Sequence, residues 1–96
     1  MTTPSKDGSM AKLSARGRTE LARVAKTYEP GDVGQVATYT YVLMSDGKTL
    51  RKAKVVWRDG HVSDRGWTRA TFYRYPTERT EWLAVFARAG YEEVTR

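Results

Sequence analysis

The stretch VATYTYVLMSDGKTLRKAKVVW, residues 36–57, decides the fold of this chain. Two runs rich in β-branched and aromatic residues flank the pair Asp46-Gly47. An Asp-Gly pair between two such runs is the strongest short-range sign of a β-hairpin. The sequence therefore predicts two antiparallel strands joined by a tight turn.

Two loop lengths fit this hairpin, and a change of register by one residue moves every side chain to the other face. A two-residue loop at Asp46-Gly47 would place Tyr41 opposite Lys52 and would mix aromatic rings with charge. A three-residue loop that begins at Ser45, with Gly47 in the left-handed conformation, separates the two kinds of side chain. We predict the three-residue loop.

This register predicts that the hairpin has one apolar face and one basic, hydroxyl-rich face. The apolar face would carry Tyr39, Tyr41, Leu43, Ala53, Val55 and Trp57. The basic face would carry Thr38 and Thr40 opposite Lys54 and Lys52. The basic face is the best functional clue in the sequence.

Length and composition limit the number of domains and show which residues can pack in a core. The 96 residues make one domain, which should bury roughly 60–70% of the surface of the unfolded chain. Residues 1–9 contain no side chain able to pack apart from the initial methionine. We expect a disordered tail at residues 1–10 and a single α+β domain at residues 11–96.

Several classes of protein are excluded by what the sequence lacks. Without cysteine and with one histidine, the chain has no disulfide framework and no zinc finger. No apolar run approaches the ~18 residues that a membrane helix needs, and the N-terminus lacks the apolar core of a signal peptide. We therefore expect a cytoplasmic protein that does not bind a membrane.

The net charge of +6 is unevenly distributed along the chain. Residues 1–75 carry fourteen Lys and Arg against seven Asp and Glu, whereas residues 76–96 carry three against four. The positive charge thus belongs to the part of the chain that is expected to form strands.

Residues 19–28 fit either a strand or a helix. Helix-forming residues dominate, yet Ala22, Val24 and Tyr28 recur at strand spacing. We predict a strand, because EPGD at 29–32 then makes a turn into the hairpin. The helical alternative would give the element order αββ(β)α.

A resemblance to known proteins appears in this region. LSARGRTELARV at 13–24, followed by an aromatic strand into Ser-Asp-Gly at 45–47 and later by Gly66-Trp67, resembles small orphan proteins of actinobacteriophages and their prophages. The resemblance covers the N-terminal third well and the rest loosely. It implies a viral accessory protein in the cytoplasm of the bacterial host, and it assigns no role to any residue because that set has no agreed activity.

The remaining segments predict a third strand and a helix. Residues 58–65 predict a loop or a short hairpin tip, and residues 66–75 predict a strand by propensity, which Pro76 ends. Thr77 is the expected N-cap of a helix that is clearest from Thr80 onward and that Gly90 stops as the C′ residue. Its apolar stripe would hold Trp82, Leu83, Val85, Phe86 and Ala89. The expected fold is α+β, with an antiparallel sheet of three to four strands packed against one C-terminal amphipathic helix.

No segment carries the pattern of an enzyme. His61 follows Gly60 in an expected turn, with no nucleophile motif nearby. Asp59 and Asp64 are too few for a calcium loop, and GDVG at 31–34 lacks the lysine and the helix of a phosphate loop. We expect a non-enzymatic protein with no catalytic residue, no cofactor and no metal.

Binding through the basic residues is the leading hypothesis. Lys and Arg contact phosphates, while Thr, Tyr and Trp add hydrogen bonds and stacking, so nucleic acid is the first candidate partner. The alternative partner is an acidic host protein, bound through the exposed aromatic anchors Trp67 or Tyr73. A solvated sheet surface would need no partner at all, and a free edge strand would allow a homodimer. The residues expected to bind nucleic acid or a protein are Arg16, Arg18, Arg23, Arg51, Lys52, Lys54, Arg58, Arg65, Trp67, Arg69, Tyr73 and Arg74.

Overall fold

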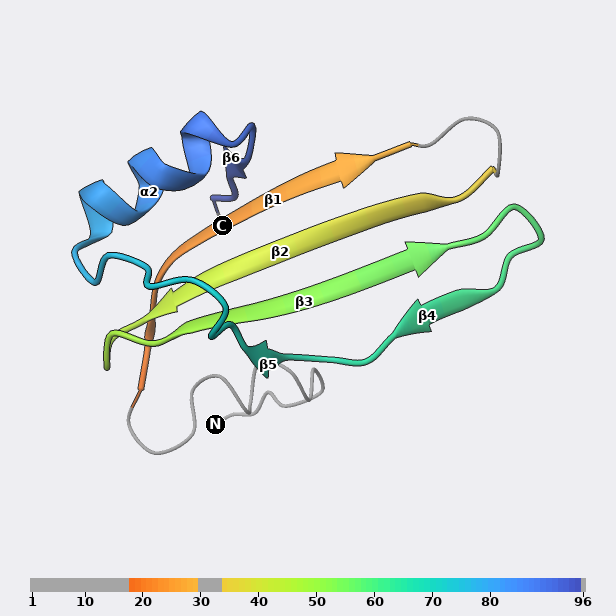
Figure 1. Cartoon of the computed structure of the whole chain (residues 1–96). Helices are drawn as coiled ribbons and strands as arrows, with labels where there is room; N and C mark the ends of the chain where they lie inside the picture. Colours follow the sequence, from red (N-terminus) through yellow and green to blue (C-terminus); the bar gives the residue numbers. More distant parts are fainter. Residues whose placement is uncertain (1–17, 30–33, 96) are drawn as a thin grey trace.

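The computed structural model describes residues 18–29 and 34–95. It consists of an antiparallel sheet with one helix on one of its faces (Figure 1). The elements are β1 (Glu20–Tyr28), β2 (Val36–Met44), β3 (Thr49–Val56), β4 (Val62–Asp64), β5 (Thr68–Arg69), α2 (Arg79–Arg88) and β6 (Glu92–Glu93). The expected tail at residues 1–10, Arg16 and most of the turn at 29–32 lie outside the described residues.

The strand order is β4-β3-β2-β1-β6, and β5 pairs with β3 on the same outer side as β4. This arrangement confirms the α+β class and the antiparallel sheet. Within the described part of the chain the sheet has six strands, which is more than the predicted three to four. The helix is also not the last element, because β6 follows it and pairs with β1.

The hairpin has the predicted register. Thr38 lies opposite Lys54 and Thr40 opposite Lys52. The loop has three residues, because the Gly47 amide donates to the Met44 carbonyl at 2.9 Å and Gly47 has a φ of 88°. A glycine in this left-handed conformation is what such a loop needs.

The prediction of a strand at residues 19–28 is also confirmed. β1 pairs with β2 from Ala22 to Tyr28, with Val24 opposite Tyr41, and a register shift between Glu20 and Ala22 leaves Leu21 outside the ladder. Ala22 and Val24 are buried while Leu21 is exposed, so the alternation that favours a strand follows the two faces of the sheet.

Two expectations for the second half of the chain are wrong, and one is confirmed. The segment 66–75 contains only the two-residue strand β5, since the chain leaves the sheet so that the Tyr75 ring can stack on Phe86 at 5.4 Å. Of the two alternatives for residues 58–65, the structure shows the short hairpin tip, because residues 62–64 form the strand β4, which pairs with β3. The helix N-cap is Glu78 and not Thr77, because the Glu78 carboxylate accepts hydrogen bonds from two amides of the first turn.

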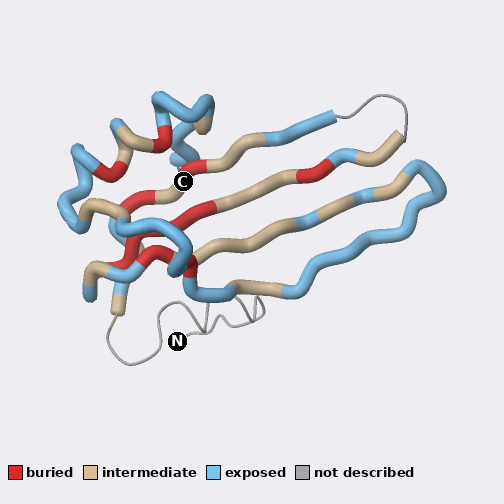
Figure 2. Tube along the Cα trace, viewed as in Figure 1, coloured by how far each residue is buried: buried red, intermediate tan, exposed pale blue. Residues whose placement is uncertain are grey.

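The main core lies between α2 and one end of the sheet. It consists of Ala22, Val24, Tyr41, Leu43, Ala70, Trp82 and Phe86. Val55 and Trp57 are expected there but are only half-buried. The reason is length, because a helix of ten residues spans about 15 Å, whereas a strand of nine residues spans about 30 Å. The buried positions therefore gather at the turn end of the hairpin (Figure 2).

The opposite face of the sheet carries apolar residues in addition to the basic, hydroxyl-rich surface that the sequence predicts. Val42 and Met44 are fully buried on the face that carries Lys52, and Leu50 and Trp67 pack against them. Both faces of the hairpin thus contribute apolar residues near the turn.

Candidate nucleic-acid interface

The face of Lys52 and Lys54 is organised around Trp67. The Lys52 ammonium lies 5.7 Å from the centre of the Trp67 ring, and the Arg23 guanidinium lies 5.3 Å from it. Both cations also have a carboxylate partner, because Lys52 pairs with Asp64 at 3.3 Å and Arg23 with Glu20 at 2.9 Å. Much of the positive charge expected on this face is therefore compensated within the face itself.

Asp64 is the residue that changes the electrostatics of this face. Its slight desolvation would raise the pKa of the carboxyl, but a hydrogen bond from the Gly66 amide and the charges of Lys52 and Lys54 outweigh it and lower the pKa. Asp64 is thus an anion at neutral pH, and β4 holds it opposite Lys54 in the ladder.

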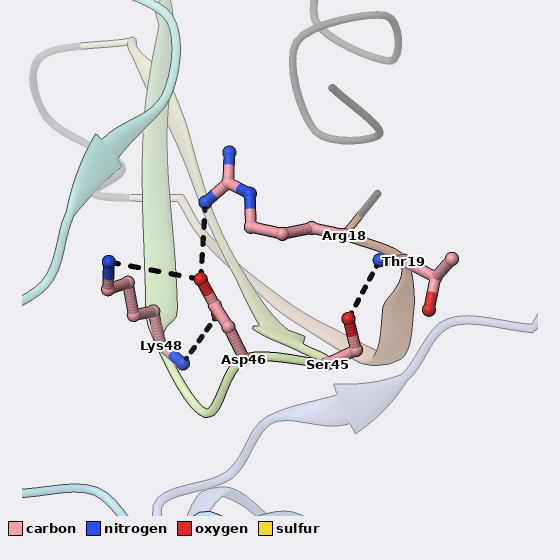
Figure 3. Close-up of polar contacts among 5 residues, drawn as sticks. All are labelled: Arg18, Thr19, Ser45, Asp46 and Lys48. Atoms are coloured by element: carbon pink, nitrogen blue, oxygen red, sulfur yellow. Dashed lines mark hydrogen bonds and ion pairs between the residues drawn. The ribbon is translucent and has the colours of Figure 1, made fainter. Parts of the chain in front are cut away.

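Arg18 likewise forms an ion pair with an acidic side chain. Its guanidinium lies 3.8 Å from the Asp46 carboxylate in the hairpin loop, and Lys48 approaches the same carboxylate at 3.8 Å (Figure 3). The Thr19 amide donates to the Ser45 hydroxyl at 2.9 Å, which ties the start of β1 to the loop. These contacts stabilise the turn end of the sheet.

The cations of β3 and β5, and of the segments that follow β3, β4 and β5, form the second group of expected site residues. Residues 49–75 carry seven Lys and Arg but only two acidic residues, Asp59 and Asp64. Apart from Lys52, none of these cations makes an ion pair within the described ranges 18–29 and 34–95. We call this group the basic edge, and its members are Arg51, Lys54, Arg58, Arg65, Arg69 and Arg74.

The helix side of the sheet has an uncovered half next to the basic edge. Opposite partners in a ladder point to the same side, so Tyr28 and Ala37 share this surface with Val55, and Tyr39 shares it with Ala53. α2 covers Tyr41 and Leu43 on the same strand but does not extend this far. We call the five residues Tyr28, Ala37, Tyr39, Ala53 and Val55 the open platform.

Two cations border the open platform. The Arg51 guanidinium lies 5.1 Å from the centre of the Tyr39 ring, and its Nε donates to the Tyr41 hydroxyl at 3.1 Å. Arg65 lines a groove of about 460 Å³ together with Arg51, Ala53 and Val55. The platform therefore combines aromatic and small apolar side chains with positive charge.

The loop between β5 and α2 exposes a separate aromatic pair. Phe72 is 74% exposed and Tyr73 is 52% exposed. Arg69 and Arg74 line the same hollow as this pair. By contrast, Trp67, the other expected anchor, is half-buried between Arg23 and Lys52.

The hydrogen bonds of the turn between β3 and β4 stabilise the turn itself. The His61 amide donates to the Asp59 carboxylate at 3.0 Å, and the Trp57 amide donates to the His61 carbonyl at 2.8 Å. In the part of the chain that the structure describes, no three His, Cys, Asp or Glu side chains gather where they could hold a metal ion. Nor does any described helix have the length and apolarity to cross a membrane.

The predicted site residues thus lie on three surfaces and not on one continuous face. Arg23, Lys52, Lys54 and Trp67 share the face opposite the helix, and Arg51 and Arg65 border the open platform. Arg69 of β5 lines one hollow with Tyr73 and Arg74 of the loop before α2. Arg58 lies at the turn between β3 and β4, the far turn of the sheet, where its side chain packs against Gly34. Sequence reasoning missed Tyr28 and Tyr39 as surface residues, because their strand periodicity is that of core positions.

Comparison with known proteins finds no matching family model, no similar curated protein and no similar solved structure. The resemblance to orphan proteins of actinobacteriophages stays a prediction. The function has to be argued from the surface chemistry.

Proposed function

We propose that the protein is a small, non-enzymatic nucleic-acid-binding protein, of the phage accessory type that the resemblance implies. The observation that carries the proposal is the basic edge, where cations without an acidic partner among the described residues follow one side of the sheet from the loop before α2 to the far turn. Each phosphate contact by such a cation releases counterions, which favours binding of any nucleic acid.

The cations near Lys52 are better placed than Lys52 itself to contact phosphates. Lys52 would have to leave Asp64 before contacting a phosphate. Lys54 faces the same carboxylate across the ladder but makes no close ion pair with it, and Arg65 and Arg69 make no ion pair among residues 18–29 and 34–95. The phosphate contacts of the proposed complex are therefore assigned to the basic edge.

Salt dependence tests the proposal. We expect fluorescence anisotropy with a short labelled single strand and the corresponding duplex to show binding that weakens steeply with salt. The variants Lys54→Ala, Arg65→Ala and Arg69→Ala should each lower the slope of log affinity against log salt by about 0.7–0.9 for each phosphate that is no longer neutralised. Arg88→Ala removes the same charge from α2 and is the matched control, with an unchanged slope.

Absence of binding at low salt to both probes would refute nucleic-acid binding. Equal slopes for the Arg88→Ala control and the edge variants would show that binding depends on the net charge of the protein and not on the positions of its cations.

A protein partner is the second candidate, favoured by the exposure of Phe72 beside Tyr73. An aromatic anchor ringed by Arg69 and Arg74 fits an acidic protein surface. A pull-down from host lysate treated with nuclease would retain such a partner, and the double variant Phe72→Ala, Tyr73→Ala would release it through faster dissociation. Disappearance of all captured protein on nuclease treatment would contradict this candidate.

A further inference from the structure

The open platform has the features of a stacking surface. The rings of Tyr28 and Tyr39, on neighbouring strands, meet edge to face at 5.5 Å, and Tyr28 is 41% exposed. Ala37, Ala53 and Val55 lie between or beside them on the helix side of the sheet, where Ala37 is buried and Tyr39, Ala53 and Val55 are half-buried. Flat rings that adjoin small side chains can accept the face of a nucleobase.

Positive charge is placed on both sides of these rings. The Lys26 ammonium lies 4.8 Å from the centre of the Tyr28 ring and donates to the Ala89 carbonyl at 2.9 Å, so α2 holds it there. The Arg51 guanidinium lies over Tyr39 on the other side. Among the described residues that line the two hollows of this surface, Glu29 is the only acidic one.

A solvated sheet surface explains this arrangement less well. Exposed strands stay soluble through charged and hydroxyl side chains, as Thr38, Thr40 and Lys54 do on the opposite face. The open platform instead consists of aromatic and aliphatic side chains, of which Tyr28 is the exposed one, and its cations lie at the border. Phosphates would contact these cations while bases lie on the rings.

We propose that the open platform binds single-stranded nucleic acid, RNA or DNA, by stacking bases on Tyr28 and Tyr39 while Arg51 and Arg65 contact the phosphates. This inference rests on the proposed nucleic-acid binding and goes further, because it names the strandedness and the surface. A duplex keeps its base faces inside the stack and presents only groove edges and phosphates. Stacking on the platform therefore requires unpaired bases, and it tolerates any sequence because every base has a π-face.

Anisotropy titrations with labelled oligo-dT, oligo-U and a duplex of equal length test the inference. We expect both single strands to bind more tightly than the duplex. Tyr28→Leu and Tyr39→Leu should each weaken single-strand binding about ten-fold or more, and Tyr28→Phe and Tyr39→Phe should bind like the wild type because the ring is kept. Duplex affinity should change little in all four variants.

A charge-matched pair covers the case in which a leucine variant fails to fold. Ala53→Glu places a carboxylate on the platform and should abolish single-strand binding. Ala84→Glu adds the same charge on the exposed side of α2 and should reduce binding only slightly. Circular dichroism of both variants checks that the sheet is intact.

The outcomes separate this inference from the function that it rests on. Tighter binding of the duplex, or leucine and Ala53→Glu variants that bind single strands like the wild type, would overturn the platform and leave nucleic-acid binding through the basic edge. No binding of any probe at low salt would overturn both.

Discussion

At the scale of single residues, one buried hydrogen bond joins distant parts of the chain. The Trp82 indole Nε1 donates to the Thr49 hydroxyl at 3.0 Å, and both residues are buried. The bond joins the helix to the start of β3. A buried polar group that is deprived of its partner costs more than the bond contributes, because it cannot return to water.

We expect Thr49→Val to destabilise the protein by about 1–3 kcal/mol, because it leaves the Trp82 N–H buried without an acceptor. The double variant Thr49→Val, Trp82→Phe removes both polar groups and should cost less than the sum of the two single changes. Urea unfolding monitored by circular dichroism measures all four proteins of this cycle. Strictly additive costs would mean that the bond contributes nothing to stability.

At the scale of elements, the helix is bounded by two specific end contacts. At its start, the Glu78 carboxylate accepts from the amides of Thr80 at 3.1 Å and Glu81 at 2.9 Å. At its end, Gly90 has a φ of 92°, and the Tyr91 amide donates to the Phe86 carbonyl at 2.9 Å. The glycine stop agrees with the prediction, and the ring contact of Tyr91 with Phe86 at 5.3 Å completes it.

The cap makes stability depend on pH. Hydrogen bonds from the Glu81 and Thr80 amides favour the carboxylate and lower the pKa of Glu78 from its ordinary 4.5. The folded state therefore takes up this proton at lower pH than the unfolded state. The contribution of the cap is complete above about pH 4.5 and declines as the pH falls through the lowered pKa.

Glu78→Gln should remove this part of the acid sensitivity. Melting temperatures of wild type and variant, measured from about pH 7 down to pH 3, should differ most at neutral pH and converge in acid. Glu81→Gln removes a charge from the same helical turn without removing the cap acceptor, and it serves as the control. A difference between wild type and Glu78→Gln that stays constant with pH would contradict the capping role.

At the scale of the whole molecule, the sheet is supported at one end and open at the other. The core between α2 and the sheet lies at the turn end of the hairpin. At the end that carries the open platform, no helix among the described residues crosses the sheet (Figures 1 and 2). Local opening is easiest where few apolar side chains have to separate. The end proposed to bind a ligand is thus also the end with the least support.

Hydrogen exchange should reveal this gradient along the hairpin. We expect hydrogen-bonded amides at residues 41–44 and 49–51 to exchange most slowly, and those at residues 36–38 and 54–56 to exchange faster, because the latter open without unpacking Trp82 and Phe86. Addition of oligo-U should slow exchange at the platform end if it binds there. Uniform protection along both strands would show that the sheet opens only as a unit.

Features that depend on near neighbours could be predicted from the sequence. The turn chemistry of Ser45–Gly47 decided the hairpin register, alternation along residues 19–28 indicated β1, and Gly90 marked the end of the helix. The uneven charge located the basic residues in the strand-forming part. These signals suffice because backbone conformation and side-chain alternation act over a few residues.

Only the tertiary structure decided which part of the sheet the helix covers and which cations are neutralised. Val55 and Trp57 share the periodicity of Tyr41 and Leu43, yet they lie beyond the reach of a ten-residue helix. Asp64 has the sequence context of a turn aspartate, but β4 brings it to Lys52. The part of the sheet that the helix covers and the ion pairs that form both depend on contacts between residues far apart in the chain. For that reason the basic residues could be named from the sequence, whereas the open platform could not.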